Sequence, residues 1–188
     1  PEITPLKIQP IIREILKLSR STLPATIKIT QSIDNDCGPV LADPTHISQI
    51  TMNLITNAFH AMEKEGGILD VTLKEINVTK EMSLEMELAP GSYASIGVAD
   101  TGKGIDTAIS EKIFEPYFTT KEKGTGTGLG LSVISGLLKT YAGKICVSSE
   151  PGKGSLFRVY LPLCPVSFTS PPSTQNRPTD LHGCESIL

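Results

Sequence analysis

The sequence predicts an α/β domain, because segments with the two-residue period of strands alternate with segments of helical period. Alternating apolar residues indicate strands at 25–33, 40–42, 68–78, 93–100, 143–149 and 155–161. Apolar residues about one turn apart indicate helices at 10–18, at 43–64, at 106–112 and from 130 onward. With 188 residues, of which 39% are hydrophobic, the chain is long enough to bury the core of one domain.

Composition and charge exclude several classes of protein. The formal net charge of −3 is too small to indicate a nucleic-acid partner. No apolar run approaches the roughly 20 residues of a membrane span, and there is no signal peptide, so we expect no membrane contact. The four cysteines lack a C-x-x-C pair, which favours reduced thiols in a cytoplasmic protein over disulfides or a zinc site. Because the first residue is proline, we expect the chain to be a fragment of a longer protein.

For the first elements of the chain, the sequence reveals only a role in packing. The helix at 10–18 carries one apolar stripe, and Pro24 bounds the turn that follows it. The strand at 25–33 places isoleucines on one face. A turn at 34–39 then leads to the short strand at 40–42.

The next helix has clear start and stop signals. Asp43 is a good N-cap, and Pro44 is tolerated at the first helical position. Gly66 and Gly67 end the helix after about residue 64. One face is an apolar stripe, so we expect this helix to lie on the core.

The opposite face of this helix carries a row of neutral polar residues, namely Gln49, Asn53, Asn57 and His60. Exposed helix faces usually carry Lys and Glu, and amides at i, i+4 spacing add little helix stability. Amide oxygens are suitable ligands for magnesium, and a bound cation would let the helix hold phosphates. A polar flank packed against a neighbouring element explains the spacing equally well.

Asp100 closes the strand at 93–100, which follows a charged loop at 79–91 and which we expect to pair antiparallel with the strand at 68–78. The carboxylate has the parity of Ile96 and Val98, so it should point to the apolar side, where it needs hydrogen-bond donors. A base with an exocyclic amino group could supply one. Gly102 and Gly104 would let the backbone turn with positive φ and approach a ligand closely.

Two other interpretations of Asp100 remain. The carboxylate could cap an ordinary Asx turn at the end of the strand. Asp-Thr-Gly also occurs in aspartic proteases, but these need two such carboxylates side by side. Because the chain has no second Asp-Thr-Gly or Asp-Ser-Gly, this interpretation requires a homodimer.

Four alternating glycines, at 124, 126, 128 and 130, precede the last apolar helix. Flexible glycines before a helix N-terminus expose free N–H groups to an anion. The register excludes other phosphate loops, because a dinucleotide fingerprint needs glycine at Leu129 or Leu131, and a P-loop needs Gly-Lys followed by Ser or Thr. The alternative is a flexible loop without a ligand.

A long segment at 114–128 leads to these glycines. Phe118 could anchor it on the core, and Lys121 and Lys123 could reach phosphates, although solvation of Lys123 is the simpler explanation. Beyond the helix, Pro151–Gly154 join the last two strands in a hairpin. Residues 165–179 are rich in Pro, Ser and Thr and indicate a flexible linker.

Four segments in order resemble the boxes of sensor histidine kinases, in the GHKL ATPase superfamily. Residues 53–58 match the N box, 100–104 the G1 box, 114–118 the F box and 126–131 the G2 box. The resemblance covers about 24–162. Gyrase, chaperone and mismatch-repair members share versions of the first two boxes, whereas Gly-Thr-Gly-Leu-Gly-Leu after an F box indicates the kinases.

The resemblance implies a role for each matching residue. Asn57 is a magnesium ligand, and Asn53 assists the metal or the phosphates in a catalytic role. Asp100 accepts a hydrogen bond from the adenine amino group. Residues 119–127 form a lid over the nucleotide, and His60 stands where many members have lysine. The remaining implied ATP-binding residues are Ala61, Gly102, Gly104, Ile105, Phe118, Thr119, Lys121, Gly126, Thr127, Gly128, Leu129 and Gly130.

The resemblance also implies the fold and the reaction. The fold is a two-layer α/β sandwich with a mixed sheet of about five strands covered on one face by three helices. The reaction moves the γ-phosphoryl group of ATP, with Mg²⁺, to a histidine on a separate dimerisation domain of a homodimeric protein. His46, His60 and His182 all lack the family's acceptor context. We therefore expect residues 1–23 to lead in from a preceding dimerisation domain, with the catalytic domain at 24–163.

Residues 164–188 would then be a linker towards a response-regulator receiver domain, because 184–188 resemble the entry to such a domain's first strand. Two further functions remain open from the sequence. One is a non-catalytic nucleotide-binding module, and the other is a different GHKL enzyme, such as an ATPase or a serine kinase.

Overall fold

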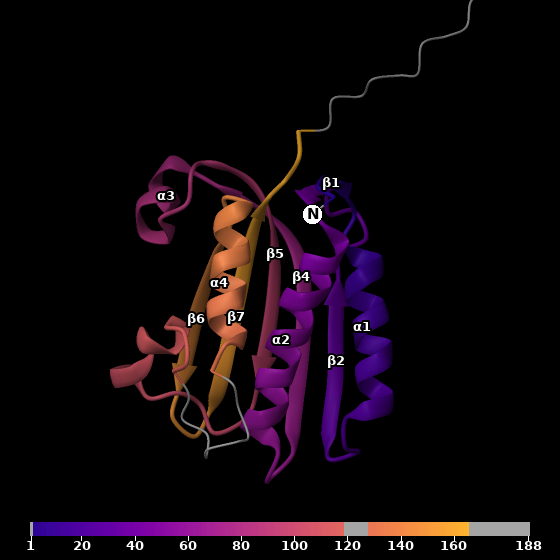
Figure 1. Cartoon of the computed structure of the whole chain (residues 1–188), viewed down its shortest axis with the longest axis vertical. Coiled ribbons are helices and arrows are strands. Elements are labelled where there is room, and N and C mark those ends of the chain that lie inside the picture. Colours follow the sequence, from indigo (N-terminus) through magenta and orange to yellow (C-terminus); the bar gives the residue numbers. More distant parts are fainter. Residues whose placement is uncertain (1, 119–127, 166–188) are drawn as a thin grey trace, which may run out of the picture.

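The computed structural model describes residues 2–118 and 128–165, and these form a five-stranded sheet with helices packed on it (Figure 1). The strands are β1 (Thr4–Leu6), β2 (Ile27–Ile33), β3 (Val40–Ala42), β4 (Gly67–Val78), β5 (Gly91–Asp100), β6 (Lys144–Glu150) and β7 (Gly154–Pro162). The helices are α1 (Gln9–Thr22), α2 (Pro44–Met62), α3 (Lys80–Met86) and α4 (Gly130–Thr140).

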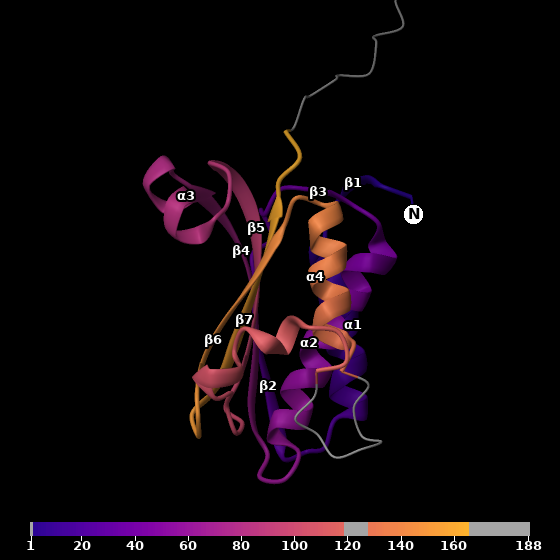
Figure 2. The same ribbon diagram turned by 60° about the vertical axis from the view of Figure 1, so that its left-hand side comes forward.

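The sheet is mixed and has the strand order β2-β4-β5-β7-β6. β2 and β4 are parallel, whereas the other three pairs are antiparallel, as expected for β4 with β5 and for the β6–β7 hairpin. The short strands β1 and β3 pair with each other outside this sheet. Figure 2 shows α1, α2 and α4 together on one side of the sheet. The predicted two-layer sandwich with three covering helices is therefore confirmed.

The core lies between this sheet and the three helices. The residues that face the helices from β4 and β5 are buried, and they include Leu69, Val71, Leu73, Ala94, Ile96 and Val98. The stripe predicted for α2 is buried against them, and it comprises Ile47, Ile50, Thr51, Leu54, Ile55, Ala58 and Met62. The apolar faces of the strands, which repeat every two residues, and the apolar stripe of α2, which has the helical period, therefore pack together in one layer.

Helix α1 contributes to the same core. Ile12 and Leu16 are completely inaccessible to solvent and belong to one apolar cluster with residues of α2, β4 and β5. Ile8, which precedes α1, is also fully buried there. The boundary expected at residue 24 therefore does not separate two cores, because removing α1 would expose apolar surface of the domain.

Two local expectations were wrong. The stretch at 79–91 was expected to be a loop, but it contains α3, which begins where the Thr79 hydroxyl accepts a hydrogen bond from the Met82 N–H (3.4 Å). This seven-residue helix buries no residue of its own, so it has no apolar stripe that sequence periodicity could reveal. The helix expected at 106–112 is instead two 3₁₀ turns, at Thr107–Ile109 and Lys112–Phe114.

Helices α2 and α4 are also tied together by polar contacts. The Tyr141 hydroxyl, just past the end of α4, lies against Nδ1 of His46 and accepts a hydrogen bond from the Asp43 N–H (3.2 Å). The two helices run antiparallel, so this contact fixes the end of α4 against the start of α2.

Among residues 2–118 and 128–165, no helix combines the length and the apolarity needed to cross a membrane.

The cap of α2 gives a testable prediction. The Asp43 carboxylate accepts hydrogen bonds from the N–H groups of Thr45 (2.7 Å) and Glu2 (2.8 Å), and these hold its pKa below the usual range. We expect Asp43→Ala to lower the melting temperature at neutral pH, because both donors lose their acceptor. Asp43→Asn, which keeps a capping oxygen without the charge, should cost less.

The pH dependence follows from the depressed pKa. A carboxylate of this kind contributes stability above its unfolded-state pKa and loses the contribution as the pH falls through its folded-state pKa. The difference in melting temperature between the wild type and Asp43→Asn should therefore shrink towards acid pH. A difference that stayed constant over that range would contradict this assignment.

Candidate functional site

Three segments come together in the lower half of the molecule in Figure 1. They are the carboxyl end of β5 with the loop that follows it, the C-terminal half of α2, and the N-terminus of α4. Of the residues that the sequence predicts to bind a nucleotide, these segments contain Asn53, Asn57, His60, Ala61, Asp100, Gly102, Gly104, Ile105, Leu129 and Gly130. The topology thus brings together motifs that are up to about 77 positions apart in the chain, as the contact between Asn53 and Gly130 shows.

Asp100 is buried on the core face of β5, with 6% of its surface exposed, as its parity predicted. Its Oδ1 accepts a hydrogen bond from the Gly102 N–H (2.8 Å), so the Asx turn considered as an alternative is present. Burial raises the pKa of Asp100, while the N–H groups of Gly102 and Ser155 act in the opposite direction. The carboxylate is therefore oriented by backbone donors and poorly solvated, which favours a further donor from a ligand.

The two glycines of this loop serve different purposes. Gly104 has φ of 68°, as expected, and its Cα lies against the carbonyl of Glu150. The expectation of positive φ was wrong for Gly102. A Cβ at Gly102 would collide with the carbonyl of Ala61, so glycine is needed there for close approach to α2. The Lys103 N–H then donates to the same Ala61 carbonyl (3.1 Å) and fixes the loop on the helix.

The amide face of α2 lies against the start of α4. Nδ2 of Asn53 donates to the carbonyl of Gly130 (3.4 Å). Amide atoms of both Asn53 and Asn57 would lie 3.9 Å from a Cβ at Gly130. His60 has 27% of its side chain exposed, and its Nδ1 is 3.7 Å from the Glu63 carboxylate. Asn53 and Asn57 thus flank a neighbouring element and also face a helix N-terminus, where anions are favoured.

The segment before α4 is described in part. Phe118 is half-buried against the core, in line with the anchor expected from the sequence. The Tyr117 N–H donates to the carbonyl of Gly128 (3.1 Å), which brings the two ends of the intervening segment together. Thr119, Lys121, Gly126 and Thr127 lie outside the described residues.

One polar residue near the site was missed from the sequence. Ser149 of β6 accepts a hydrogen bond from the N–H of Ile105, an expected ATP-binding residue (2.8 Å). A signal was available, because Ser149 has the same parity as Ile145 and Val147 and thus places a hydroxyl on the core face of β6.

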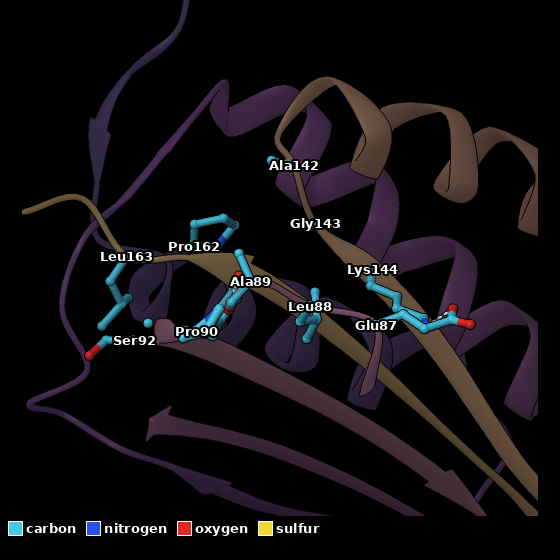
Figure 3. Close-up of a pocket in the computed structure, with 12 residues that line it drawn as sticks. Glu87, Leu88, Ala89, Pro90, Ser92, Ala142, Gly143, Lys144, Pro162 and Leu163 are labelled. Carbon is cyan, nitrogen blue, oxygen red and sulfur yellow. Dashed lines mark hydrogen bonds and ion pairs between the residues drawn. The ribbon is translucent and has the colours of Figure 1, made fainter. Parts of the chain in front are cut away.

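One hollow in the described surface lies away from this meeting point, and a second borders it at Asp100. A cavity of about 670 Å³ is lined by residues 87–93, 142–144 and 162–163, with the ion pair of Lys144 and Glu87 (2.6 Å) at its side (Figure 3). It lies at the opposite ends of β5 and β7 from Asp100. A second cavity of about 420 Å³ touches Asp100 from the β6–β7 hairpin. The larger cavity therefore does not coincide with the candidate site, which is defined by the residues that converge at Asp100, α2 and α4.

A family model described as "Histidine kinase-, DNA gyrase B-, and HSP90-like ATPase" matches residues 42–165. The chain belongs to this ATPase family. The chain is 37% identical over 163 residues to the sensor kinase CckA of Brucella abortus (strain 2308), a match that covers 86% of this chain and 17% of CckA. It is 33% identical over 153 residues to the sensor histidine kinase ZraS of Klebsiella oxytoca, covering 81% of this chain and 30% of ZraS. The chain thus spans less than a third of each of these relatives.

Solved structures of histidine kinases share the fold. The nucleotide-free catalytic domain of ThkA matches with a TM-score of 0.70 and 29% identity over 87% of this chain and 97% of that domain. Full-length ShkA in complex with AMPPNP matches with a TM-score of 0.70 and 26% identity, over 87% of this chain and 31% of ShkA. ThkA in complex with the response regulator TrrA matches with a TM-score of 0.66 and 25% identity, over 87% of this chain and 42% of that chain. The resemblance inferred from the four boxes is confirmed, and the ATPase domain is of the sensor histidine kinase type.

The raised pKa of Asp100 predicts a stability cost. A group whose folded-state pKa is raised contributes stability below its unfolded-state pKa and loses it as the pH rises through the folded-state pKa. Asp100→Asn stays neutral and can still accept from the Gly102 N–H. We therefore expect the free energy of unfolding of Asp100→Asn, without ligand, to rise relative to the wild type as the pH increases. Urea titrations at several pH values would measure this, and a relative gain by the wild type would contradict it.

Proposed function

We propose that this chain is the ATP-binding catalytic domain of a sensor histidine kinase. In this proposal it binds Mg²⁺–ATP and transfers the γ-phosphoryl group to a histidine on a separate dimerisation domain. The observation that carries the proposal is the meeting of the buried Asp100 carboxylate, the amide face of α2 and the N-terminus of α4 at one end of the sheet. The named relatives, which are sensor kinases, favour phosphoryl transfer to histidine over the other reactions of the family.

The base would bind beside Asp100. Its exocyclic amino group would donate to the carboxylate, which burial leaves short of solvent donors. Ala61, Gly102, Gly104 and Ile105 would form the walls around the base, because the backbone contacts described above hold them next to Asp100.

The phosphates would bind between α2 and α4. The first N–H groups of α4 favour anions, and Gly128 to Gly130 keep this approach free of side chains apart from that of Leu129. His60 lies on the same face of α2 and could contact a phosphate oxygen. Phe118, Thr119, Lys121, Gly126 and Thr127 would belong to the lid over the nucleotide.

Asn57 and Asn53 fit a magnesium ion that is also held by phosphate oxygens and water. In the described part of the chain, no group of three or more His, Cys, Asp or Glu could hold a metal by itself. Magnesium commonly takes few protein ligands and keeps several waters, so amide oxygens next to bound phosphates suit it. The ion would offset charge that develops on the phosphates during transfer.

The acceptor histidine and the regulator would come from elsewhere in the kinase. His46 is engaged with Tyr141 at the far end of α2, and His60 lies within the proposed phosphate site. The complex of ThkA with TrrA supports a response-regulator receiver domain as a further partner. A homodimeric parent protein in the cytoplasm, with or without a membrane anchor, completes the proposal.

Calorimetric titration with ATP, with and without Mg²⁺, tests nucleotide binding. We expect magnesium-assisted binding by the wild type and a rise in Kd of about 10- to 100-fold for Asp100→Asn, since a hydrogen bond to a charged group contributes about 1.5–3 kcal/mol. Asp70→Asn is the matched control, because Asp70 carries the same charge on β4 and bonds Thr30 instead. Absence of binding by folded wild-type protein would refute an ATP site that works in this chain alone.

Addition of a cognate histidine domain with radiolabelled ATP then tests phosphoryl transfer. Label on that domain's histidine is the expected result. Binding without transfer would favour a non-catalytic nucleotide module, whereas transfer to serine or release of phosphate alone would indicate another enzyme of the superfamily.

A further inference from the structure

The β6–β7 hairpin holds the loop that carries the expected base-binding residues. The Ile105 N–H donates to Oγ of Ser149 (2.8 Å), and the Gly152 N–H donates to the carbonyl of Lys103 (2.8 Å). On its other side this loop is held by the Ala61 carbonyl. The loop after β5 is therefore fixed between α2 and the hairpin.

Close packing of backbone reinforces these bonds. A Cβ at Gly104 would collide with the carbonyl of Glu150, and a Cβ at Gly154 would collide with the carbonyl of Asp100. Neither strand of the hairpin carries a residue assigned to the nucleotide. The hairpin therefore acts on the site through this loop and, directly, through the Ser155 N–H, which faces the Asp100 carboxylate.

Ser149 is the side chain through which this contact is made. Its hydroxyl lies 2.8 Å from the carbonyl of Gly154, 3.0 Å from Oγ of Ser155 and 2.8 Å from the N–H of Ile105. A serine hydroxyl has one proton to donate and two lone pairs to accept with. Donation to Gly154, with acceptance from Ser155 and Ile105, uses its whole capacity.

We infer that Ser149 is a positioning residue for nucleotide binding. Its hydroxyl holds the Ile105 N–H and thereby keeps the segment from Gly102 to Ile105 in the arrangement that receives the base. This inference rests on the proposed function. Order that exists before the ligand arrives lowers the entropy cost of binding, so loss of the hydroxyl weakens binding even when the fold persists.

A purely structural role makes a different prediction. If Ser149 only joined β6 to β7, its loss would lower the melting temperature without changing the affinity of folded protein for ATP. Because the hydroxyl also bonds Ile105, which lies outside the hairpin, we expect both quantities to change.

The test compares Ser149→Thr with Ser149→Val. These side chains have nearly the same shape, both suit a strand, and only threonine keeps the hydroxyl. Calorimetric titration of the full chain with Mg²⁺–ATP should give a Kd near the wild-type value for Ser149→Thr. For Ser149→Val the Kd should rise about tenfold, which corresponds to about 1.4 kcal/mol. Ser149→Ala should behave like the valine variant.

Two controls come from the same strand. Ser148→Ala removes the exposed neighbouring hydroxyl and should leave both affinity and stability unchanged. Val147→Ala removes packing from the core face of β6, so it should lower the melting temperature and leave the Kd unchanged.

The outcomes separate this inference from the proposed function. If the wild type binds Mg²⁺–ATP and the valine and threonine variants bind equally well, Ser149 has no positioning role while the ATP site stands. If Val147→Ala weakens binding as much as Ser149→Val, general destabilisation explains the effect and the inference fails. If folded wild-type protein does not bind Mg²⁺–ATP, the proposed function fails and the inference fails with it.

Discussion

The contact between the loop after β5 and the end of α2 is the constraint on which the site depends. Asn53, Asn57 and Ala61 lie four residues apart and therefore share one face of the helix. The Ala61 carbonyl receives the Lys103 N–H and packs against Gly102, so the same face that presents the amides also sets the position of the loop. The cap at Asp43 fixes where this helix starts.

Asp100 would combine, in the proposed site, a cost to stability with a role in binding. The alternation that buries Ile96 and Val98 also buries this carboxylate, and burial raises its pKa. The N–H groups of Gly102 and Ser155 offset only part of the cost of burying this carboxylate. A carboxylate that is held in one orientation and poorly hydrated is disadvantageous to the empty protein but well suited to a ligand that brings its own donor.

Helix α4 is fixed at both ends against α2. The carbonyl of its first residue, Gly130, accepts a hydrogen bond from Asn53. The hydroxyl of Tyr141, beyond its last turn, accepts one from the Asp43 N–H at the start of α2. The separation between the amide face and the N-terminus of α4 therefore depends on contacts at two distant places.

The sequence by itself determined the features that depend on neighbouring residues. Period-two and helical patterns predicted the main strands and α2, Asp43 and Pro44 predicted its start, and the order of the four boxes predicted the family. These signals work because side-chain direction, capping and turns are local properties of the chain.

Tertiary structure decided what depends on residues distant in sequence. The parallel pairing of β2 with β4, the inclusion of α1 in the main core and the pairing of β1 with β3 have no local signal. Gly102 allows close approach to the carbonyl of Ala61, and Ser149 accepts a hydrogen bond from the Ile105 N–H, 44 positions away. Such partners are chosen only when the layers pack, because a free carbonyl or hydroxyl in the sequence does not specify which donor will reach it.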